Sequence, residues 1–473
     1  MKKLIILLLF IPLIQPIMAQ DTPVLSKVSD LEQKIDALVK QYQDLDLFAG
    51  VVLVSERGTP FYHKAFGYAD RENKRKNTID TKFDIGSMNK AFTKVVVLQL
   101  VKEGKLSFDD PLGKYLDGFD ADIARKVTVG QLLDHTSGFG DYHDPTYFDR
   151  SYEEKDMHQL LPLFRKLPLM FEPGTEQAYS NAGYVLLGLI IEKATGKDYF
   201  EVVRERAVDK LGLKNTYLTE KYRTPERAIG YTRTMRGELE ANDYFQDPPK
   251  PDGGFYSTTL DMLRFFRAYH YGEELWDEAT RSLDPMFTFL QEHKDSGGAI
   301  PHAGGFSGAN TVHYEILRDQ VSIDVFANRD ELVAEDVGTG ILAIIRGKEP
   351  EKPAQPAHLL IYRSYRDKGI DYVRDHFEEL STNWHPADPK DMILNMIGYN
   401  LMYSDDPAEV DQAIEVLTLN TELFPEVANV WDSLGEAWLR KGDKTKALRY
   451  YKKALAIRPD LPSALEAVKG LED

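Results

Sequence analysis

The chain has no cysteine among its 473 residues. This absence excludes disulfide bonds, thiolate metal sites and a cysteine nucleophile. Its eleven histidines include no His-Glu-x-x-His pattern, so no zinc-hydrolase ligand set is present and we expect neither a metal nor another cofactor. No Gly-x-Ser-x-Gly occurs either, which argues against the nucleophile turn of an α/β-hydrolase.

Basic residues are also scarce, because 58 Lys and Arg face 76 Asp and Glu and give a formal charge of −18. Such a charge argues against nucleic acid or an anionic membrane as the main partner.

The sequence begins with Lys2 and Lys3, followed by a short apolar run from Leu4 to Met18. We predict that residues 1–19 are a signal peptide and that the mature protein is periplasmic or secreted, without stable membrane insertion. An uncleaved anchor is the alternative, which the short run disfavours.

Predicted strands lie at both ends of the first two thirds of the chain, and predicted helices lie between them. Short apolar runs predict strands over 48–54, 61–68, 302–316 and 321–327. Helical spacing of apolar residues predicts helices over 91–101, 128–133, 183–195, 257–271 and 334–346. We therefore expect residues 27–346 to form one α/β (α+β) sandwich, with an antiparallel sheet and a helical subdomain.

A charged, proline-rich linker over 347–357 separates this region from residues 358–473, where only helices are predicted. Eight residues fall at the spacings of a tetratricopeptide repeat (TPR): Trp431, Leu434, Gly435, Trp438, Ala447, Tyr451, Ala454 and Pro459. Ala413, Leu417 and Pro425 repeat part of this pattern 34 residues earlier. We predict an all-α TPR solenoid that binds a protein partner or packs on the first domain; a generic helical bundle is the alternative.

Ser87 and Lys90 form the only Ser-x-x-Lys of the chain, at the start of an apolar helix. Residues three apart share a helix face, so the Lys90 amine can reach the Ser87 hydroxyl. The positive helix end and partial burial both favour the neutral amine that a general base requires. This pair therefore predicts a serine nucleophile that is activated without histidine. The simpler interpretation is a helix cap beside a solvated lysine.

Two further segments carry candidate site residues. Tyr179 and Asn181 form the only Tyr-x-Asn of the chain, on a predicted loop before a helix. The phenol can relay a proton and the amide can hold a substrate carbonyl, although a buried tyrosine with a satisfied hydroxyl is the simpler interpretation. His302 precedes Gly304 and Gly305 on a predicted strand, and the Gly305 and Ser87 N–H groups can form an oxyanion hole. Here the simpler interpretation is a histidine at a bulged strand start.

In this order, the three segments resemble motifs of the serine β-lactamase and penicillin-binding protein superfamily, specifically its class C β-lactamase-related branch. Four longer stretches share the resemblance, which covers about residues 30–346: 83–90, 104–111, 132–138 and 253–258. The resemblance implies that Ser87 is acylated, Lys90 activates it and Tyr179 shuttles protons as a partly ionised phenol. It further implies that Asn181 orients the substrate and that His302 replaces the lysine of the Lys-Thr-Gly strand motif.

The implied reaction is acyl transfer to Ser87 followed by hydrolysis of the acyl-enzyme. An ester, a D-amino-acid peptide or amide, and a β-lactam all remain open as substrates. Since His302 is mostly neutral at pH 7, the site should hold a carboxylate less firmly than a lysine would. This favours an esterase or peptidase over a dedicated β-lactamase, with a DD-carboxypeptidase or penicillin-binding protein as an alternative. A non-catalytic, TPR-bearing binding protein is a further alternative. Tyr142 and His143 are expected near the rim of the cleft.

Overall fold

A computed structural model describes residues 28–143, 145–243, 247–329, 332–384 and 388–472; the predicted signal peptide lies outside them. The chain forms two compact units. The first holds the residues up to Thr232 and Ala241–Lys352, and the second holds Arg233–Glu240 together with the residues from Pro353 onward. Each unit is described by itself.

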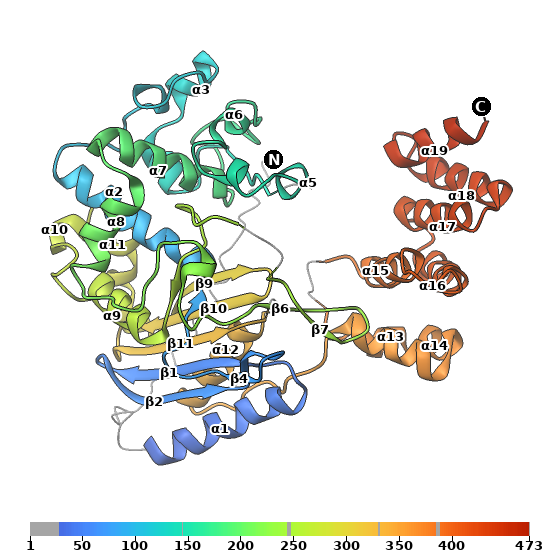
Figure 1. Ribbon diagram of the computed structural model, residues 1–473, viewed down its shortest axis with the longest axis horizontal. Coiled ribbons are helices and arrows are strands. Elements are labelled where there is room, and N and C mark those ends of the chain that lie inside the picture. The colour runs from blue at the N-terminus through green and yellow to red at the C-terminus, as the bar shows by residue number, and fades with distance from the viewer. Residues whose placement is uncertain (1–27, 144, 244–246, 330–331, 385–387, 473) are drawn as a thin grey trace. The chain divides into compact units, whose positions relative to one another are not determined.

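The first unit is built on a five-stranded sheet whose strand order is β2-β1-β11-β10-β9 (Figure 1). The bounds of these strands are β1 Gly50–Glu56, β2 Thr59–Phe66, β9 Ile300–Phe306, β10 Ala309–Ile316 and β11 Val321–Ala327. Every neighbouring pair is antiparallel, and Gly50 of β1 lies opposite Ala327 of β11. The two ends of this unit's sequence thus meet in one sheet, which confirms the predicted antiparallel sandwich.

The single strand predicted over 302–316 is wrong. The segment forms a hairpin in which β9 and β10 are joined at Ser307 and Gly308, and Gly305 lies opposite Asn310. Gly308 has a φ of +74°, the left-handed conformation that a tight turn needs and that glycine adopts without strain. Ser307-Gly308 is a turn signal in the sequence, which the prediction of one continuous strand passed over.

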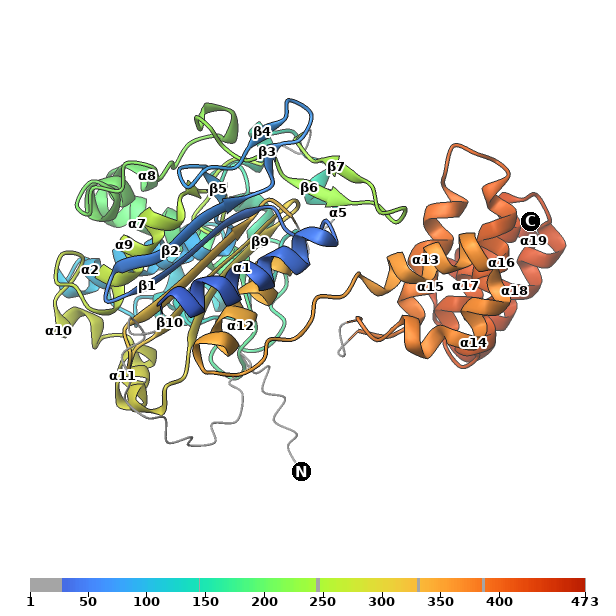
Figure 2. The same ribbon diagram turned by 90° about the horizontal axis from the view of Figure 1, so that it is seen from below.

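Helices cover both faces of the sheet (Figure 2). On one face, α1 (Val28–Asp44) and α12 (Val333–Ile345) pack against the strands. Leu31, Ile35 and Leu38 of α1 are buried at the three- and four-residue spacing that lines one side of a helix. The opposite face carries α2 (Lys90–Lys102), α7 (Asn181–Thr195) and α9 (Thr259–His270).

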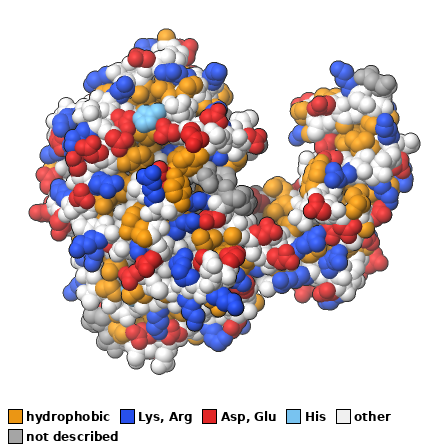
Figure 3. All heavy atoms as spheres, viewed as in Figure 1, with side chains coloured by type: hydrophobic (Ala, Val, Ile, Leu, Met, Phe, Trp, Pro, Cys, Tyr) orange, Lys and Arg blue, Asp and Glu red, His pale blue; other side chains and the backbone are white. Residues whose placement is uncertain are grey.

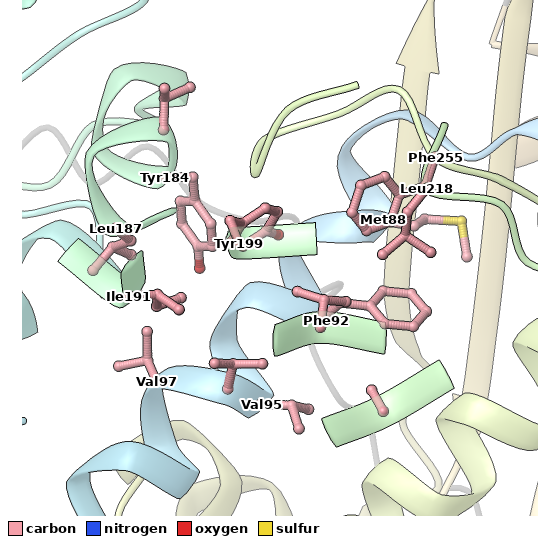
Figure 4. Close-up of a cluster of buried hydrophobic side chains, with 14 of the residues drawn as sticks. Met88, Phe92, Val95, Val97, Tyr184, Leu187, Ile191, Tyr199, Leu218 and Phe255 are labelled. Carbon is pink, nitrogen blue, oxygen red and sulfur yellow. The ribbon is translucent and has the colours of Figure 1, made fainter. Parts of the chain in front are cut away.

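Helix α2 is buried on nearly all sides and forms the centre of the larger core (Figure 4). The Phe92 ring stacks on Phe265 of α9 at 3.9 Å between centroids. Val97 lies near Ile191 of α7, and Val95 and Leu187 belong to the same cluster. Because this packing fixes α2, it also fixes the turn immediately before it, which carries Ser87.

Shorter elements complete the first unit. Its remaining helices are α3 (Ala121–Lys126), α4 (Val129–Leu133), α5 (Pro145–Phe148), α6 (Leu161–Phe164), α8 (Tyr199–Val203), α10 (Glu278–Arg281) and α11 (Pro285–Glu292). The short strands pair as β3 (Tyr68–Asp70) with β4 (Arg75–Lys76), β5 (Phe83–Asp84) with β8 (Tyr256–Ser257), and β6 (Tyr231–Arg233) with β7 (Leu239–Ala241).

The second unit is a succession of helices, as the TPR spacing predicted. They are α13 (Ala357–Lys368), α14 (Ile370–Leu380), α15 (Asp391–Met402), α16 (Glu409–Leu423), α17 (Ala428–Arg440), α18 (Lys444–Ile457) and α19 (Pro462–Glu472). A Cβ on Gly435 of α17 would lie 3.0 Å from the Tyr451 ring of α18, so glycine allows these two helices to approach. A Cβ on Gly398 of α15 would likewise clash with the Leu417 side chain of α16, so glycine allows close approach here too.

The tip of the β6–β7 hairpin packs with the helices of the second unit, although its sequence lies inside the predicted catalytic region. Met235 contacts the core of this unit, and Arg236 forms a 2.5 Å ion pair with Glu409 of α16. Gly237 lies against Leu359 of α13. These contacts explain why Arg233–Glu240, which include the adjoining ends of β6 and β7, belong to the second unit.

Acidic and basic side chains are interspersed over the face of the molecule seen in Figure 3. None of the helices in the described part of the chain combines the length and the hydrophobicity needed to cross a bilayer.

Candidate active site

Ser87, Lys90 and Tyr179 meet at the start of α2. Ser87 lies in a 3₁₀ turn over Gly86–Asn89, and α2 begins at Lys90. Side chains three residues apart are nearly eclipsed in such a turn, and the Lys90 Nζ lies 3.0 Å from the Ser87 Oγ. The Tyr179 hydroxyl approaches from another segment and lies 2.6 Å from the same oxygen. The structure thus brings together the three residues predicted to be catalytic.

Lys90 is buried and held from two further sides. Its Nζ donates to the Asn181 Oδ1 and to the backbone carbonyl of Asp252, each at 2.7 Å. Burial lowers the pKa of Lys90 to about 8, while the carboxylates of Asp252 and Asp141 oppose this shift. The direction agrees with the prediction that the site favours a neutral amine.

The surroundings of Tyr179 favour a neutral phenol over the partly ionised one expected from the family resemblance. Partial burial raises the pKa of Tyr179 to about 12, and the hydrogen bond to Ser87 only partly offsets this effect. The ring stacks on the imidazole of His135 at 4.9 Å between centroids. The Nδ1 of His135 also accepts the Ser180 N–H at 3.1 Å, so His135 positions the whole Tyr179 segment.

Asn181 is the first residue of α7, and both ends of its amide are engaged. Its Oδ1 accepts from Lys90, and its Nδ2 donates to Asp141 at 3.1 Å. Asp141 also contacts the His143 Nδ1 at 2.7 Å. Although burial raises the pKa of Asp141, the hydrogen bonds from His143 and Asn181 outweigh it and hold the pKa below its usual range. The Asn181 amide is therefore fixed beside Lys90.

Gly304 and Gly305 of β9 lie directly against the turn that carries Ser87. A Cβ on Gly304 would be 2.0 Å from the Ile85 carbonyl oxygen and 2.9 Å from the Ser87 nitrogen. A Cβ on Gly86, whose φ is +49°, would be 2.7 Å from the Gly305 nitrogen. Only glycine fits this approach, which sets the Gly305 backbone beside Ser87. The arrangement suits the predicted oxyanion hole.

His302 is not among the described residues that line the space around Ser87. Its imidazole packs on Phe266 at 4.3 Å between ring centroids, and its Nε2 lies 3.2 Å from the Nε2 of His270. Burial holds the pKa of His302 well below its usual range, so the ring is neutral. That His302 contacts the substrate stays a prediction. The packing of its side chain against α9 indicates that it helps to hold β9 in place.

Ser87 opens on two spaces. The deep cavity, of about 550 Å³, is lined by residues that include Asp84, Asp141, Asn181, Asp252 and Gly305. The shallow hollow on the other side is lined by residues that include Tyr179, Ala303, Gly304, Leu332 and Glu335. One space can hold the acyl part of a substrate while the other holds its leaving group.

Several residues of this site escaped the sequence analysis. Asp252 acts on Lys90 through its backbone carbonyl, which no sequence pattern reveals. Asp84 and Asp141 also line the deep cavity; Asp84 lies in the stretch 83–90 but was given no role, and Asp141 lies in none of the stretches singled out. Of the two residues expected at the rim, His143 lines the deep cavity. Tyr142 is buried and donates to the Asp252 Oδ2 at 2.8 Å.

Comparison with known proteins agrees with this geometry. Residues 35–345 match the family model described as Beta-lactamase, and residues 428–461 match a tetratricopeptide repeat. A penicillin-binding protein of Bacillus subtilis strain 168 is 26% identical over 94% of this chain and 96% of its own length.

Solved structures show the same fold. The crystal structure of a penicillin-binding protein from Bacillus halodurans has a TM-score of 0.57 and 28% identity, over 65% of this chain and 98% of its own. A D-amino acid amidase from Ochrobactrum anthropi has a TM-score of 0.56 and 23% identity, over 67% and 99% of the two chains. This chain belongs to the beta-lactamase family of serine hydrolases and carries a C-terminal tetratricopeptide repeat.

Proposed function

We propose that this chain is an exported hydrolase that forms an acyl-enzyme on Ser87 and cleaves an ester, a D-amino-acid amide or peptide, or a β-lactam. One observation carries the proposal: the Ser87 Oγ is contacted by both the Lys90 Nζ and the Tyr179 hydroxyl, at 3.0 and 2.6 Å. This arrangement supplies a nucleophile, a base and an acid around one oxygen.

In the acylation step, the neutral Lys90 amine takes the Ser87 proton as Oγ attacks the substrate carbonyl carbon. The N–H groups of Ser87 and Gly305 stabilise the oxyanion that forms. Collapse of this intermediate breaks the bond to the leaving group, which receives the Tyr179 proton. The proton on Lys90 then returns to Tyr179, so the seryl proton has in effect moved to the leaving group.

In the deacylation step, water attacks the Ser87 ester and gives its proton to the neutral Lys90 amine, while Tyr179 protonates Oγ and is then reprotonated by Lys90. The bond between the acyl carbon and Oγ breaks, Oγ is reprotonated, and a free acid leaves. The Asn181 amide, which Asp141 and Lys90 fix in place, lies where it can orient the acyl group. Lys90 thus acts as the base and Tyr179 as the acid in both steps.

A penicillin-binding protein is the second candidate, which the match along nearly all of the Bacillus subtilis relative favours. Incubation with benzylpenicillin followed by intact-mass measurement separates it from the esterase or amidase alternative. A persistent adduct that Ser87→Ala abolishes would support a penicillin-binding peptidase, and consumption of the drug without an adduct would support a β-lactamase. An intact drug and no adduct would favour the esterase or amidase.

Two parts of the proposal rest on the sequence. The basic and apolar start of the chain supports export to the periplasm or the medium. The repeat matched over 428–461 supports a protein partner for the second unit. Fractionation of the native host, with an antibody against residues 28–472, tests the first part. Loss of secretion after deletion of residues 1–19 would confirm it, and unchanged secretion would overturn it.

Covalent labelling by a fluorophosphonate tests the catalytic proposal. The native chain should be labelled on the peptide that contains Ser87, and Ser87→Ala should remain unlabelled. Ser137→Ala, which changes the serine of the His-Thr-Ser-Gly stretch, is the matched control and should still be labelled. An unlabelled native chain would favour the non-catalytic, TPR-bearing binding protein instead.

A further inference from the structure

The basic side chains that line the deep cavity all hold carboxylates already. Arg227 contacts Asp243 at 2.7 Å, and Lys221 contacts the same residue at 3.4 Å. Lys250 contacts Asp247 at 2.9 Å. Every lysine or arginine among the described lining residues is therefore engaged in an ion pair. A substrate carboxylate would have to compete with these pairs for a cation.

Two carboxylates of the same cavity have no ion-pair partner among the described residues. The Asp84 Oδ1 accepts, at 2.8 Å, the N–H of Gly86, which is the first residue of the turn that carries Ser87. Asp252 is only 4% exposed; its Oδ2 accepts from Tyr142, while its Oδ1 is buried without a hydrogen-bond partner in the described part of the chain. The described residues that line the deep cavity thus include more carboxylates than lysines and arginines.

The shallow hollow on the other side of Ser87 is likewise lined by a carboxylate and offers no cation among its described residues. Glu335 lies in the first turn of α12, where the Asn310 Nδ2 donates to its Oε1 at 3.2 Å. Its charge offsets the positive end of that helix, which would otherwise attract an anion. Leu332 is exposed beside it, and no lysine or arginine occurs among the described residues lining this hollow. A leaving group with a carboxylate would meet Glu335.

We infer that the Ser87 site selects substrates whose acyl part carries a protonated amine and whose leaving group carries no carboxylate. The chemical class is an aminoacyl amide or ester with a free amino group, which Asp84 binds in the deep cavity. This inference rests on the proposed function and narrows its substrate range. It places N-acylated peptides with a free carboxyl end, and β-lactams that carry a carboxylate, among the poor substrates.

The electrostatics of Asp84 agree with this assignment. Burial raises the pKa of Asp84 to about 6, against the opposing hydrogen bond from Gly86 and the more distant charges of Lys221 and Lys250. The group is therefore largely ionised at pH 7 but poorly stabilised, and a bound ammonium group would supply the missing partner. A hydrogen bond between two charged groups is stronger than one between neutral groups, so removal of the Asp84 charge should weaken binding about tenfold or more.

Two matched pairs of substrates test the inference. The first pair is D-alanine p-nitroanilide and its N-acetyl derivative, which differ only in the amine. The second pair is D-alanyl-D-alanine amide and D-alanyl-D-alanine, which differ only in the leaving-group carboxylate. In the native chain, kcat/KM should be about tenfold or more higher for the first member of each pair. Both enantiomers of the acyl residue are measured, because the charge argument does not depend on chirality.

Two variants test whether Asp84 and Glu335 cause these differences in kcat/KM. Asp84→Asn keeps an oxygen that can accept the Gly86 N–H and should reduce the amine to N-acetyl ratio about tenfold. Glu335→Gln should reduce the amide to carboxylate ratio. Asp30→Asn removes an exposed carboxylate of α1 and should change neither ratio. Labelling of each variant by a fluorophosphonate verifies that Ser87 is still correctly placed.

The result separates this inference from the proposed function. If Ser87 is not labelled in the native chain, the proposed function fails. If Ser87 is labelled but the N-acetyl substrate is cleaved equally well or better, the function stands and the charge inference is wrong. An unchanged ratio in Asp84→Asn would likewise remove Asp84 from substrate recognition.

Discussion

The Lys90 Nζ lies 3.0 Å from the Ser87 Oγ because one 3₁₀ turn places the two side chains on the same side of the chain. Burial of α2 holds that turn in place and also lowers the pKa of Lys90 to about 8. One packing arrangement therefore supplies both the geometry and the protonation state of the base.

The pH profile should follow Lys90. A base acts in its deprotonated form, so kcat/KM for a neutral ester should rise with pH and level off above a midpoint near 8. Lys90→Arg, which remains charged throughout, should reduce the rate about 10²-fold or more and remove this midpoint. A native profile that is flat between pH 6 and 9 would show that Lys90 is not the base.

Tyr179→Phe should reduce kcat about 10²-fold or more, because the leaving group loses its proton donor. The loss should be greatest for an amide and smaller for a p-nitrophenyl ester, whose leaving group needs little protonation. His135→Ala removes the stacked ring and should give a smaller loss of the same kind. If Tyr179→Phe affects the two substrates equally, Tyr179 does not protonate the leaving group.

Gly304→Ala should reduce activity about 10²-fold, because the added methyl group displaces β9 from the Ser87 turn and disrupts the oxyanion hole. Gly305→Ala is the matched comparison for stability, since its Cβ would meet no atom closer than 3.8 Å. Thermal unfolding should begin at a lower temperature in Gly304→Ala only. Equal unfolding temperatures would show that the contact between Gly304 and Ile85 is not as close as described.

A chain that ends at Lys352 should still fold, because both hydrophobic clusters of the first unit are made of residues between Leu31 and Ile345. It should nevertheless aggregate more readily, since Met235 loses the helices that cover it. Met235→Ser in the shortened chain should restore solubility, which light scattering measures. Loss of cooperative unfolding in the shortened chain would instead show that the second unit is needed for folding.

Much of this site could be predicted from the sequence, because its chemistry depends on local motifs. Ser87 and Lys90 share one turn, and Tyr179 lies two residues from Asn181, so short patterns carried the signal. The contribution of Asp252 is made by a backbone carbonyl and is independent of residue type. The packing of the His302 side chain of β9 depends on Phe266 and His270 of α9, which belong to a different element.

The fold shows the same division between local and distant contacts. The antiparallel sheet and most of its helices followed from periodicity. The separation of β9 from β10 depended on one short turn at Ser307 and Gly308. The packing of the β6–β7 tip depends on Arg236 and Glu409, which are 173 residues apart. No local pattern predicts a contact over that distance.

Detection of the acyl-enzyme tests the central claim most directly. The native chain and Ser87→Ala are mixed with p-nitrophenyl acetate, quenched in acid during the first turnover, digested and analysed by mass spectrometry. The account predicts one acetyl group on Ser87 of the native chain, a burst of p-nitrophenol, and neither signal in Ser87→Ala. Acetylation of another residue, or an equal burst from Ser87→Ala, would contradict it.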